Sequence, residues 1–229
     1  MKYLVATGDP EGSAIKTEVV DITDPSKSCL LSDLPYINGA ASCSLGSSPI
    51  ICGGYAGSDD SYRDQCIVVG SSLTITMNEK RYYPSVVSLN STTLWVVGGH
   101  YHDRLDSTEF ISLNGDASYG PDIPVKMYAG CMVKNPEDDN IYILGGLGLS
   151  TNVFTSIWVV NPSDSFSISQ GPSMNTARYN FGCGTMSLGS QQAIIAAGGQ
   201  PEGFGDLSSV EVLIPSTANS IWLSGTYIC

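Results

Sequence analysis

Short apolar runs that end in a pair of glycines recur along the chain. Four such segments, PIICGG, LWVVGG, IYILGG and AIIAAGG, have glycine pairs that begin at positions 53, 98, 145 and 198. The spacings are 45, 47 and 53 residues, and YLVATG at 3–8 continues the series 46 residues earlier, with Thr7 in place of the first glycine. A recurring interval of this length indicates a repeat protein, here with five copies of one unit.

Each unit holds further segments with the character of β-strands. A β-branched or aromatic run follows the polar loop after each glycine pair, a weaker run leads to a proline or basic residue, and a run of small residues opens the next unit. The β-branched or aromatic runs lie at 15–22, 64–69, 107–113, 156–160 and 208–214. The weaker runs lie at 28–35, 72–81, 117–124, 166–174 and 220–225, and the runs of small residues lie at 38–45, 83–89, 128–133 and 181–188. Four short strands per unit, with no helical period over 10 to 12 residues, predict an all-β repeat fold. A β-propeller satisfies this pattern because it leaves only short, protected strand edges.

The unit resembles the kelch repeat, in which four hydrophobic residues precede Gly-Gly and a basic residue opens the next blade. RYYPSVVSL, GPDIPVKMYAGCMV and GPSMNTARYNFGCGTM resemble the blade junctions of animal secreted or surface kelch proteins. The basic position is assigned to Arg81, Lys126 and Arg178, with Tyr36 in the second blade. The resemblance implies a single kelch-type propeller of about five blades, at approximately 1–35, 36–81, 82–124, 125–174 and 175–225.

The chain begins at the second strand of a unit, so four blades are complete and the first lacks one strand. Two interpretations stay open. The chain is either a piece of a larger propeller, of six blades by resemblance, or a five-bladed ring with one three-stranded blade. An open ring would expose an unpaired edge and an apolar face.

The charge balance bears on the class of partner. The chain has 22 acidic and 10 basic residues, a formal net charge of −12, and this charge would repel nucleic acid and anionic lipid surfaces. No apolar stretch approaches the roughly 18 residues of a membrane span, and MKYLVATG lacks the apolar core of a signal peptide.

The loop HYHDR contains both histidines of the chain. His100, His102 and Asp103 are weak candidates for metal ligands, but no further ligand stands at the spacing of a metal motif. A polar turn between two strands is the favoured interpretation. No catalytic or phosphate-binding motif is present, so we expect no cofactor.

The loops after the glycine pairs differ in length, charge and aromatic content, which is typical of a binding face on a repeat scaffold. Tyrosine and arginine are common at interaction hot spots. The candidate contact residues are Tyr55, Arg63, Tyr101, Arg104 and Phe204, together with Arg81, Lys126 and Arg178 from the junctions. The alternative for the junction residues is that they stabilise contacts between blades.

The seven cysteines leave the redox compartment open. Cys52 and Cys66 lie on successive strands of one blade, where they can form a disulfide that would favour an oxidising compartment. Cys43, Cys131 and Cys183 are expected to be small core residues. Cys29 could instead pair with Cys43, and Cys229 would remain unpaired.

Asn90 begins the sequon Asn-Ser-Thr in an expected exposed turn, which fits a glycosylated extracellular protein.

These features favour a non-catalytic module that binds a protein or glycoprotein partner through the loop-bearing rim, outside the cell; a cytoplasmic location stays open. The alternative is an enzyme that acts on a sugar or small molecule at the central channel, since some kelch-type propellers are sugar isomerases or copper oxidases. An intracellular ligase adaptor is a third interpretation, without an oligomerisation domain in this chain to support it.

Overall fold

The fold is almost entirely antiparallel β-structure. The computed structural model describes residues 3–8, 16–21, 29–31, 37–56, 61–203, 205–215 and 220–225. One short 3-10 helix, η2 (Leu149–Thr151), is present among these residues. The predicted all-β class is confirmed.

Four sheets of four strands each form the body of the molecule, and we name them blades I to IV. Blade I consists of β4 (Ala41–Leu45), β5 (Ser48–Cys52), β8 (Gln65–Val68) and β9 (Thr74–Thr76). Blade II consists of β10 (Ser85–Ser88), β11 (Thr93–Val97), β14 (Thr108–Ser112) and β15 (Ala117–Tyr119). Blade III consists of β16 (Cys131–Lys134), β17 (Ile141–Leu144), β18 (Ile157–Asn161) and β19 (Ser167–Gln170). Blade IV consists of β20 (Gly182–Leu188), β21 (Gln191–Ala197), β22 (Val210–Leu213) and β23 (Trp222–Gly225).

Three smaller sheets complete the strand inventory of the described residues. The strands β1 (Tyr3–Gly8), β2 (Lys16–Asp21) and β3 (Cys29–Leu31) form a three-stranded sheet. Two short hairpins extend from the blades: β6 (Tyr55–Ala56) with β7 (Ser61–Tyr62), and β12 (His100–Tyr101) with β13 (Asp103–Arg104).

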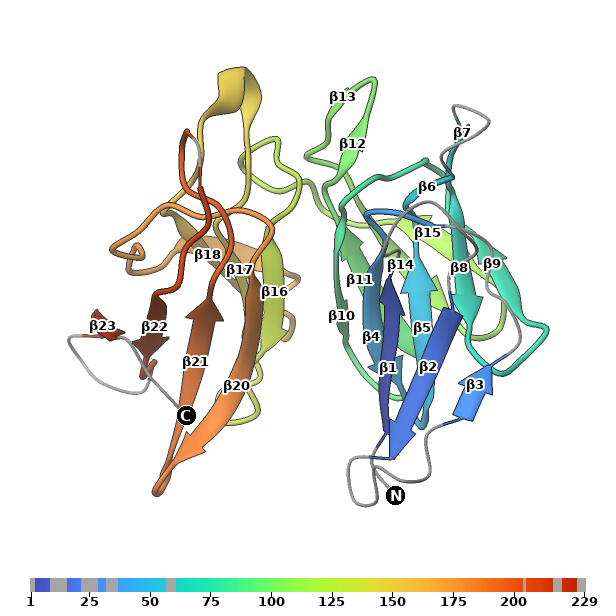
Figure 1. The fold of residues 1–229 in the computed structure, drawn as a ribbon, viewed down its shortest axis with the longest axis horizontal. Helices are drawn as coiled ribbons and strands as arrows, with labels where there is room; N and C mark the ends of the chain where they lie inside the picture. Colours follow the sequence, from blue (N-terminus) through green and yellow to red (C-terminus); the bar gives the residue numbers. More distant parts are fainter. Residues whose placement is uncertain are drawn as a thin grey trace.

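The blades are arranged as a β-propeller. The first strands of the blades lie side by side in the order β4, β10, β16, β20, and Figure 1 shows the blades fanning outward from them. The structure thus shows four complete blades and does not support the prediction of five. The predicted first blade, 1–35, is described only as the strands β1 to β3.

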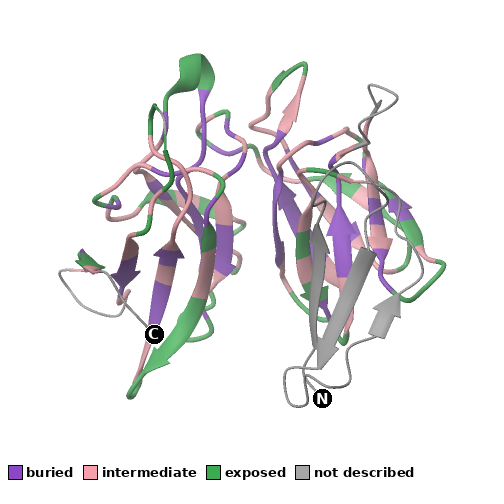
Figure 2. Ribbon diagram, in the orientation of Figure 1, coloured by how far each residue is buried: buried purple, intermediate pink, exposed green. Residues whose placement is uncertain are grey.

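The hydrophobic core is divided into layers between consecutive blades. Along β11, Leu94 and Val96 join a cluster shared with blade I, whereas Trp95 and Val97 join a cluster shared with blade III. A third cluster lies between blades III and IV. Both faces of β11 and β17 are therefore buried, as Figure 2 shows for β11, and this explains their continuously apolar sequences.

The glycine pairs of blades I, II and III each fix their blade to the junction that leads into the next blade. The second glycine donates its N–H to a junction carbonyl: Gly54 to Arg81 (2.7 Å), Gly99 to Met127 (2.9 Å) and Gly146 to Arg178 (2.9 Å). These contacts define the equivalent junction positions. Met127, and not Lys126, therefore corresponds to Arg81 and Arg178, so the predicted basic position was displaced by one residue in blade III.

Arg81 and Arg178 continue from these junctions into the interior of the following blade. Arg81 donates to Gly98 O (2.8 Å), Ser107 O (2.9 Å) and Glu109 Oε1 (3.0 Å). Both ions of the Arg81–Glu109 pair are fully buried. A residue with no exposed surface cannot contact a partner, so Arg81 is removed from the predicted contact residues.

The same arrangement recurs in blade IV. Arg178 donates to Gly198 O (2.7 Å) and to Glu211 Oε1 (2.8 Å), and both of these ions are again fully buried. Arg178 is likewise removed from the predicted contact residues. In both cases the alternative interpretation, stabilisation of contacts between blades, describes what the side chain does.

Blade III uses apolar residues at the equivalent positions. Register places Trp158 opposite Ile143, as Glu109 lies opposite Val96 and Glu211 opposite Ala196. Met127 and Trp158 thus replace the arginine and glutamate; Met127 belongs to the hydrophobic cluster between blades II and III, and Trp158 packs against that cluster. Buried ion pairs and apolar pairs of similar size are often comparable in stability, which makes the exchange between blades physically reasonable.

Candidate functional site

Bridges within each blade bring the loops after the glycine pairs and the blade junctions to one end of the molecule. The junction residue before the first strand pairs with the residue that follows Gly-Gly. The bridges are Asn38 with Tyr55, Tyr82 with His100, Tyr128 with Leu147, and Tyr179 with Gln200. This end, which carries β6, β7, β12 and β13 at the top of Figure 1, is called the rim below.

A chain of backbone hydrogen bonds links the junctions around the mouth of the central channel. Tyr83 donates to Gly39 O (2.6 Å), Ala129 to Tyr83 O (2.9 Å) and Asn180 to Ala129 O (2.9 Å). All four residues have a left-handed backbone, with φ of 63° at Gly39, 50° at Tyr83, 56° at Ala129 and 52° at Asn180. The repeated conformation shows that the four junctions are built alike, although their side chains differ.

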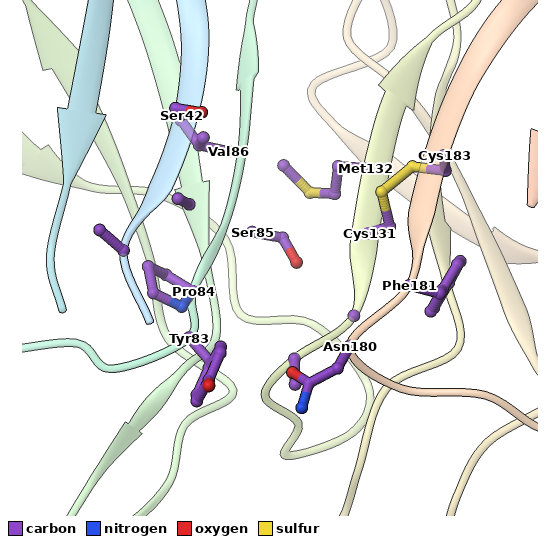
Figure 3. A pocket seen from close by; sticks show the side chains of 14 residues that line it. Ser42, Tyr83, Pro84, Ser85, Val86, Cys131, Met132, Asn180, Phe181 and Cys183 are labelled. Carbon is purple, nitrogen blue, oxygen red and sulfur yellow. A yellow bond between two sulfur atoms is a disulfide. The ribbon is translucent and has the colours of Figure 1, made fainter. Parts of the chain in front are cut away.

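Beneath this mouth lies a cavity of about 550 Å³ between the first strands of the blades. Figure 3 shows residues of all four blades around it, among them Ser42, Ser85, Met132 and Cys183. The 14 lining residues include no charged side chain. The channel is therefore a neutral, partly polar space.

The HYHDR loop is a tight hairpin at the rim. Tyr101 pairs with Asp103, and His102 forms the tip with a positive φ of 58°. His100 instead packs its ring against Tyr62 and Tyr128. Asp103 forms an ion pair with Lys126 (3.6 Å). No group of three metal-ligating side chains occurs within the part of the chain that the structure describes.

Tyrosine side chains gather on this rim from three blades. We name as the tyrosine rim the residues Tyr55, Tyr62, Tyr82, Tyr83, His100, Tyr101 and Tyr128. Tyr62 lies at its centre, with ring centroids 5.4 Å from Tyr55, 6.0 Å from Tyr82 and 5.6 Å from Tyr101. These residues are half-buried, so each ring packs against its neighbours while part of its surface faces outward.

Burial favours the neutral forms of three members of the tyrosine rim, Tyr82, Tyr128 and His100. Burial and the neighbouring Tyr83 raise the pKa of Tyr82, and burial raises the pKa of Tyr128. Burial, followed by the nearby Arg104 charge, lowers the pKa of His100, so its imidazole is neutral at pH 7. These three side chains thus contribute neutral rings to the rim.

Cationic side chains flank the aromatic rings. The Arg104 guanidinium lies 5.6 Å from the Tyr128 ring centroid, and Lys80 Nζ lies 5.8 Å from that of Tyr101. The Nε atoms of Arg63 and Arg104 are buried without a hydrogen-bond partner among the described residues.

The predicted contact residues divide by position. Tyr55, Arg63, Tyr101 and Arg104 lie at the rim, and Lys126 is exposed beside Asp103. Phe204, and Tyr36 at the predicted basic position, lie outside the described residues. Sequence analysis did not single out Tyr62, Tyr82 or Tyr128, because tyrosines 20 to 46 residues apart have no motif spacing.

Two disulfides are present among the residues that the structure describes. Cys52 and Cys66 are directly opposite each other on β5 and β8, with an S–S distance of 2.10 Å, which confirms the predicted pair. Cys131 and Cys183 form a second bond, with an S–S distance of 2.01 Å, and are not free core residues as predicted. Cys43 is a free thiol, so the alternative pairing with Cys29 is not observed. Cys229 lies outside the described residues.

Asn90 occupies an exposed turn between β10 and β11. Its side-chain oxygen accepts hydrogen bonds from the backbone N–H groups of Thr92 and Thr93, both at 2.9 Å. Strand direction places this turn at the end of blade II opposite the rim. A glycan at Asn90 would therefore leave the rim uncovered.

Comparison of the sequence with models of known protein families gives no match, and comparison with curated proteins gives none at a significant level. Among the described residues, no helix is long and apolar enough to cross a membrane. We therefore infer the function from the site itself.

Proposed function

We propose that the chain is a non-catalytic interaction module whose tyrosine rim binds a protein or glycoprotein partner. The observation that carries the proposal is the continuous group of half-exposed aromatic rings contributed by blades I, II and III. Tyrosine and arginine supply large contact areas at small cost in conformational entropy.

The flanking arginines strengthen this proposal. The side chains of Arg63 and Arg104 are partly exposed, and their guanidinium groups would donate hydrogen bonds to carbonyl or carboxylate oxygens that a partner brings to the rim. The neutral rings would then provide the apolar part of the interface and the arginines its polar specificity.

The enzyme alternative would place chemistry at the central channel. General acid–base catalysis on a sugar or small molecule needs positioned titratable groups. The 14 residues that line the cavity include no histidine, lysine, arginine or carboxylate. We therefore place the proposed function on the rim.

Substitutions at the centre of the tyrosine rim are expected to weaken partner capture. Tyr62→Ala and Tyr101→Ala should each lower affinity by roughly tenfold or more, because each removes a central ring from the contact surface. Capture from extracellular extracts on immobilised chain, followed by titration with the captured partner, measures this loss. Tyr119→Ala is the matched control, since Tyr119 is 58% exposed on the outer strand β15.

Equal losses for Tyr62→Ala and Tyr119→Ala would contradict the proposal, as would unchanged binding of both rim variants. Circular dichroism of each variant shows whether the fold is retained.

We also propose that the propeller is of the kelch type and that β1 to β3 belong to a fifth blade. The support is the recurrence of Gly-Gly after each second strand, together with arginine at two junctions. The number of blades in the full protein stays a prediction.

The two disulfides fit an extracellular location, which we propose together with glycosylation at Asn90. Expression through a secretory pathway is expected to add a glycan mass that Asn90→Gln removes. Because Asn90 lies away from the rim, the variant should bind partners as the wild type does. Intact masses that differ only by the one CH2 group that glutamine adds to asparagine would exclude the modification.

A further inference from the structure

The two disulfides occupy contrasting environments. Cys52 and Cys66 have no exposed surface and lie inside the cluster between blades I and II. Cys131 and Cys183 are each partly exposed and line the central cavity. Figure 3 shows the Cys131–Cys183 bond in the cavity wall, near Met132 and Phe181.

The Cys131–Cys183 bond also differs in what it joins. It connects β16 to β20, the first strands of blades III and IV, across 52 residues of chain. The Cys52–Cys66 bond connects neighbouring strands of one blade. Only the former therefore holds two blades together.

Blade IV has exposed apolar surface, so a covalent bond to blade III would add to the contacts that hold it in place. Most of β20 is exposed, as Figure 2 shows, and Met186, Leu188, Ile221 and Leu223 are exposed on this blade. Its contacts with blade III include the cluster at their interface, the disulfide, and hydrogen bonds from Asn180 to Ala129 O, from Gly146 to Arg178 O and from Gln192 to Glu137 Oε2.

From these observations we infer that the Cys131–Cys183 disulfide is a redox modification site, which is reduced by a low-molecular-weight thiol that enters the central channel. Thiol–disulfide exchange requires access of a thiolate to a sulfur atom. The cavity of about 550 Å³ has room for a small thiol and no charged lining to repel one. The inference does not depend on the binding proposed for the rim.

The exchange proceeds in two balanced steps. A thiolate RS⁻ attacks one sulfur of the bond, a mixed disulfide forms, and the other cysteine leaves as a thiolate that takes up a proton. A second thiol then attacks the mixed disulfide, releasing RSSR and the second cysteine. Two thiols are oxidised, one protein disulfide is reduced, and blades III and IV lose their covalent connection.

Selective reduction tests the inference. The folded chain is exposed to glutathione, quenched with an alkylating reagent and digested, and labelled cysteines are identified by mass spectrometry. Cys131 and Cys183 should become labelled roughly tenfold faster than Cys52 and Cys66. Equal rates at the two bonds, or faster reduction of Cys52–Cys66, would overturn the inference.

A second experiment tests the route through the channel. Ser42 is exposed in the cavity wall, so Ser42→Trp should obstruct the channel and slow reduction of Cys131–Cys183 by roughly tenfold. Ser118→Trp on the outer strand β15 is the matched control and should leave the rate unchanged. If Ser42→Trp fails to fold, the rate at which glutathione reduces Cys131–Cys183 in the wild-type protein is compared with the rate for a thiol on a long polyethylene glycol chain, which should be slower. Reduction at one rate under all these conditions would overturn the channel route.

The consequence for blade IV is measured by hydrogen exchange. After reduction, the amides of β20 to β22 should exchange faster, whereas those of β5 and β11 should not change. The double variant Cys131→Ser/Cys183→Ser should show the same pattern and a Tm lower by roughly 5–15 °C. Unchanged exchange in blade IV would show that the Cys131–Cys183 disulfide does not stabilise the contact between blades III and IV.

Discussion

Glu109→Ala is expected to lower the free energy of unfolding by about 3–5 kcal/mol, because it leaves the buried Arg81 guanidinium without its fully buried counterion. The Glu109 carboxylate also accepts hydrogen bonds from the backbone N–H groups of Asn78 (2.6 Å) and Glu79 (3.1 Å). Its loss therefore releases the turn before the junction as well. Urea unfolding measures the change in free energy. As a second measure, the Tm should fall by roughly 6–20 °C.

Glu79→Ala is the matched control for this prediction. Glu79 also forms an ion pair with Arg81 (2.9 Å), but its side chain is 31% exposed. Solvent screens such a pair, so the loss should be under about 1 kcal/mol. Similar losses for the two variants would contradict the buried pair seen in the structure.

A double variant separates the ion pair from its surroundings. Arg81→Met/Glu109→Leu imitates the apolar pair of blade III, where Met127 and Trp158 occupy the equivalent positions. It should lose less stability than the sum of the two single variants, because no unpaired charge remains buried. Additive losses would mean that the two side chains are not coupled.

The repeat and the strand order of the fold could be predicted from sequence because they depend on local patterns. Each second strand is apolar on both faces and ends in Gly-Gly, and those features are visible without three-dimensional information. The register of the junctions could not be predicted from sequence. Lys126 is the only basic residue near its junction, but the position is defined by the hydrogen bond from Gly99 to Met127 O, which depends on how blades II and III meet.

The second disulfide illustrates the same limit. Cys131 lies opposite Leu144, the residue before its glycine pair, whereas Cys183 lies opposite Ala196, one residue further from its own pair. The two cysteines therefore occupy different registers in their blades. Their pairing depends on the stagger between β16 and β20, which repeat spacing does not reveal. The Cys52–Cys66 pair could be predicted because both strands belong to one hairpin.

Recognition of the tyrosine rim required both the sequence and the three-dimensional structure. Tyr55 and Tyr101 were recognised as loop residues, but their connection through Tyr62 appears only when the hairpins β6–β7 and β12–β13 lie together. Bridges between junctions and loops create that proximity, and they join residues 17 to 21 positions apart.

Gly98→Ala is expected to destabilise the chain far more than the same change at Gly198. Both are the first glycine of a pair, with φ of 60° and 67°. Both also accept a hydrogen bond from a buried arginine, Arg81 in one case and Arg178 in the other. The backbone strain of alanine, about 1–2 kcal/mol, is therefore common to the two sites.

The two glycines differ in what a β-carbon would meet. At Gly98 it would lie 2.6 Å from Met127 O, which accepts the hydrogen bond from Gly99, whereas at Gly198 the nearest atom is Leu207 O at 3.5 Å. Gly98→Ala must displace the junction between blades II and III, at a total cost of about 2–5 kcal/mol. Gly198→Ala should cost only the strain. Chemical denaturation of the two variants measures the difference, and equal losses would show that the glycine pair serves backbone conformation alone and does not set the contact between blades.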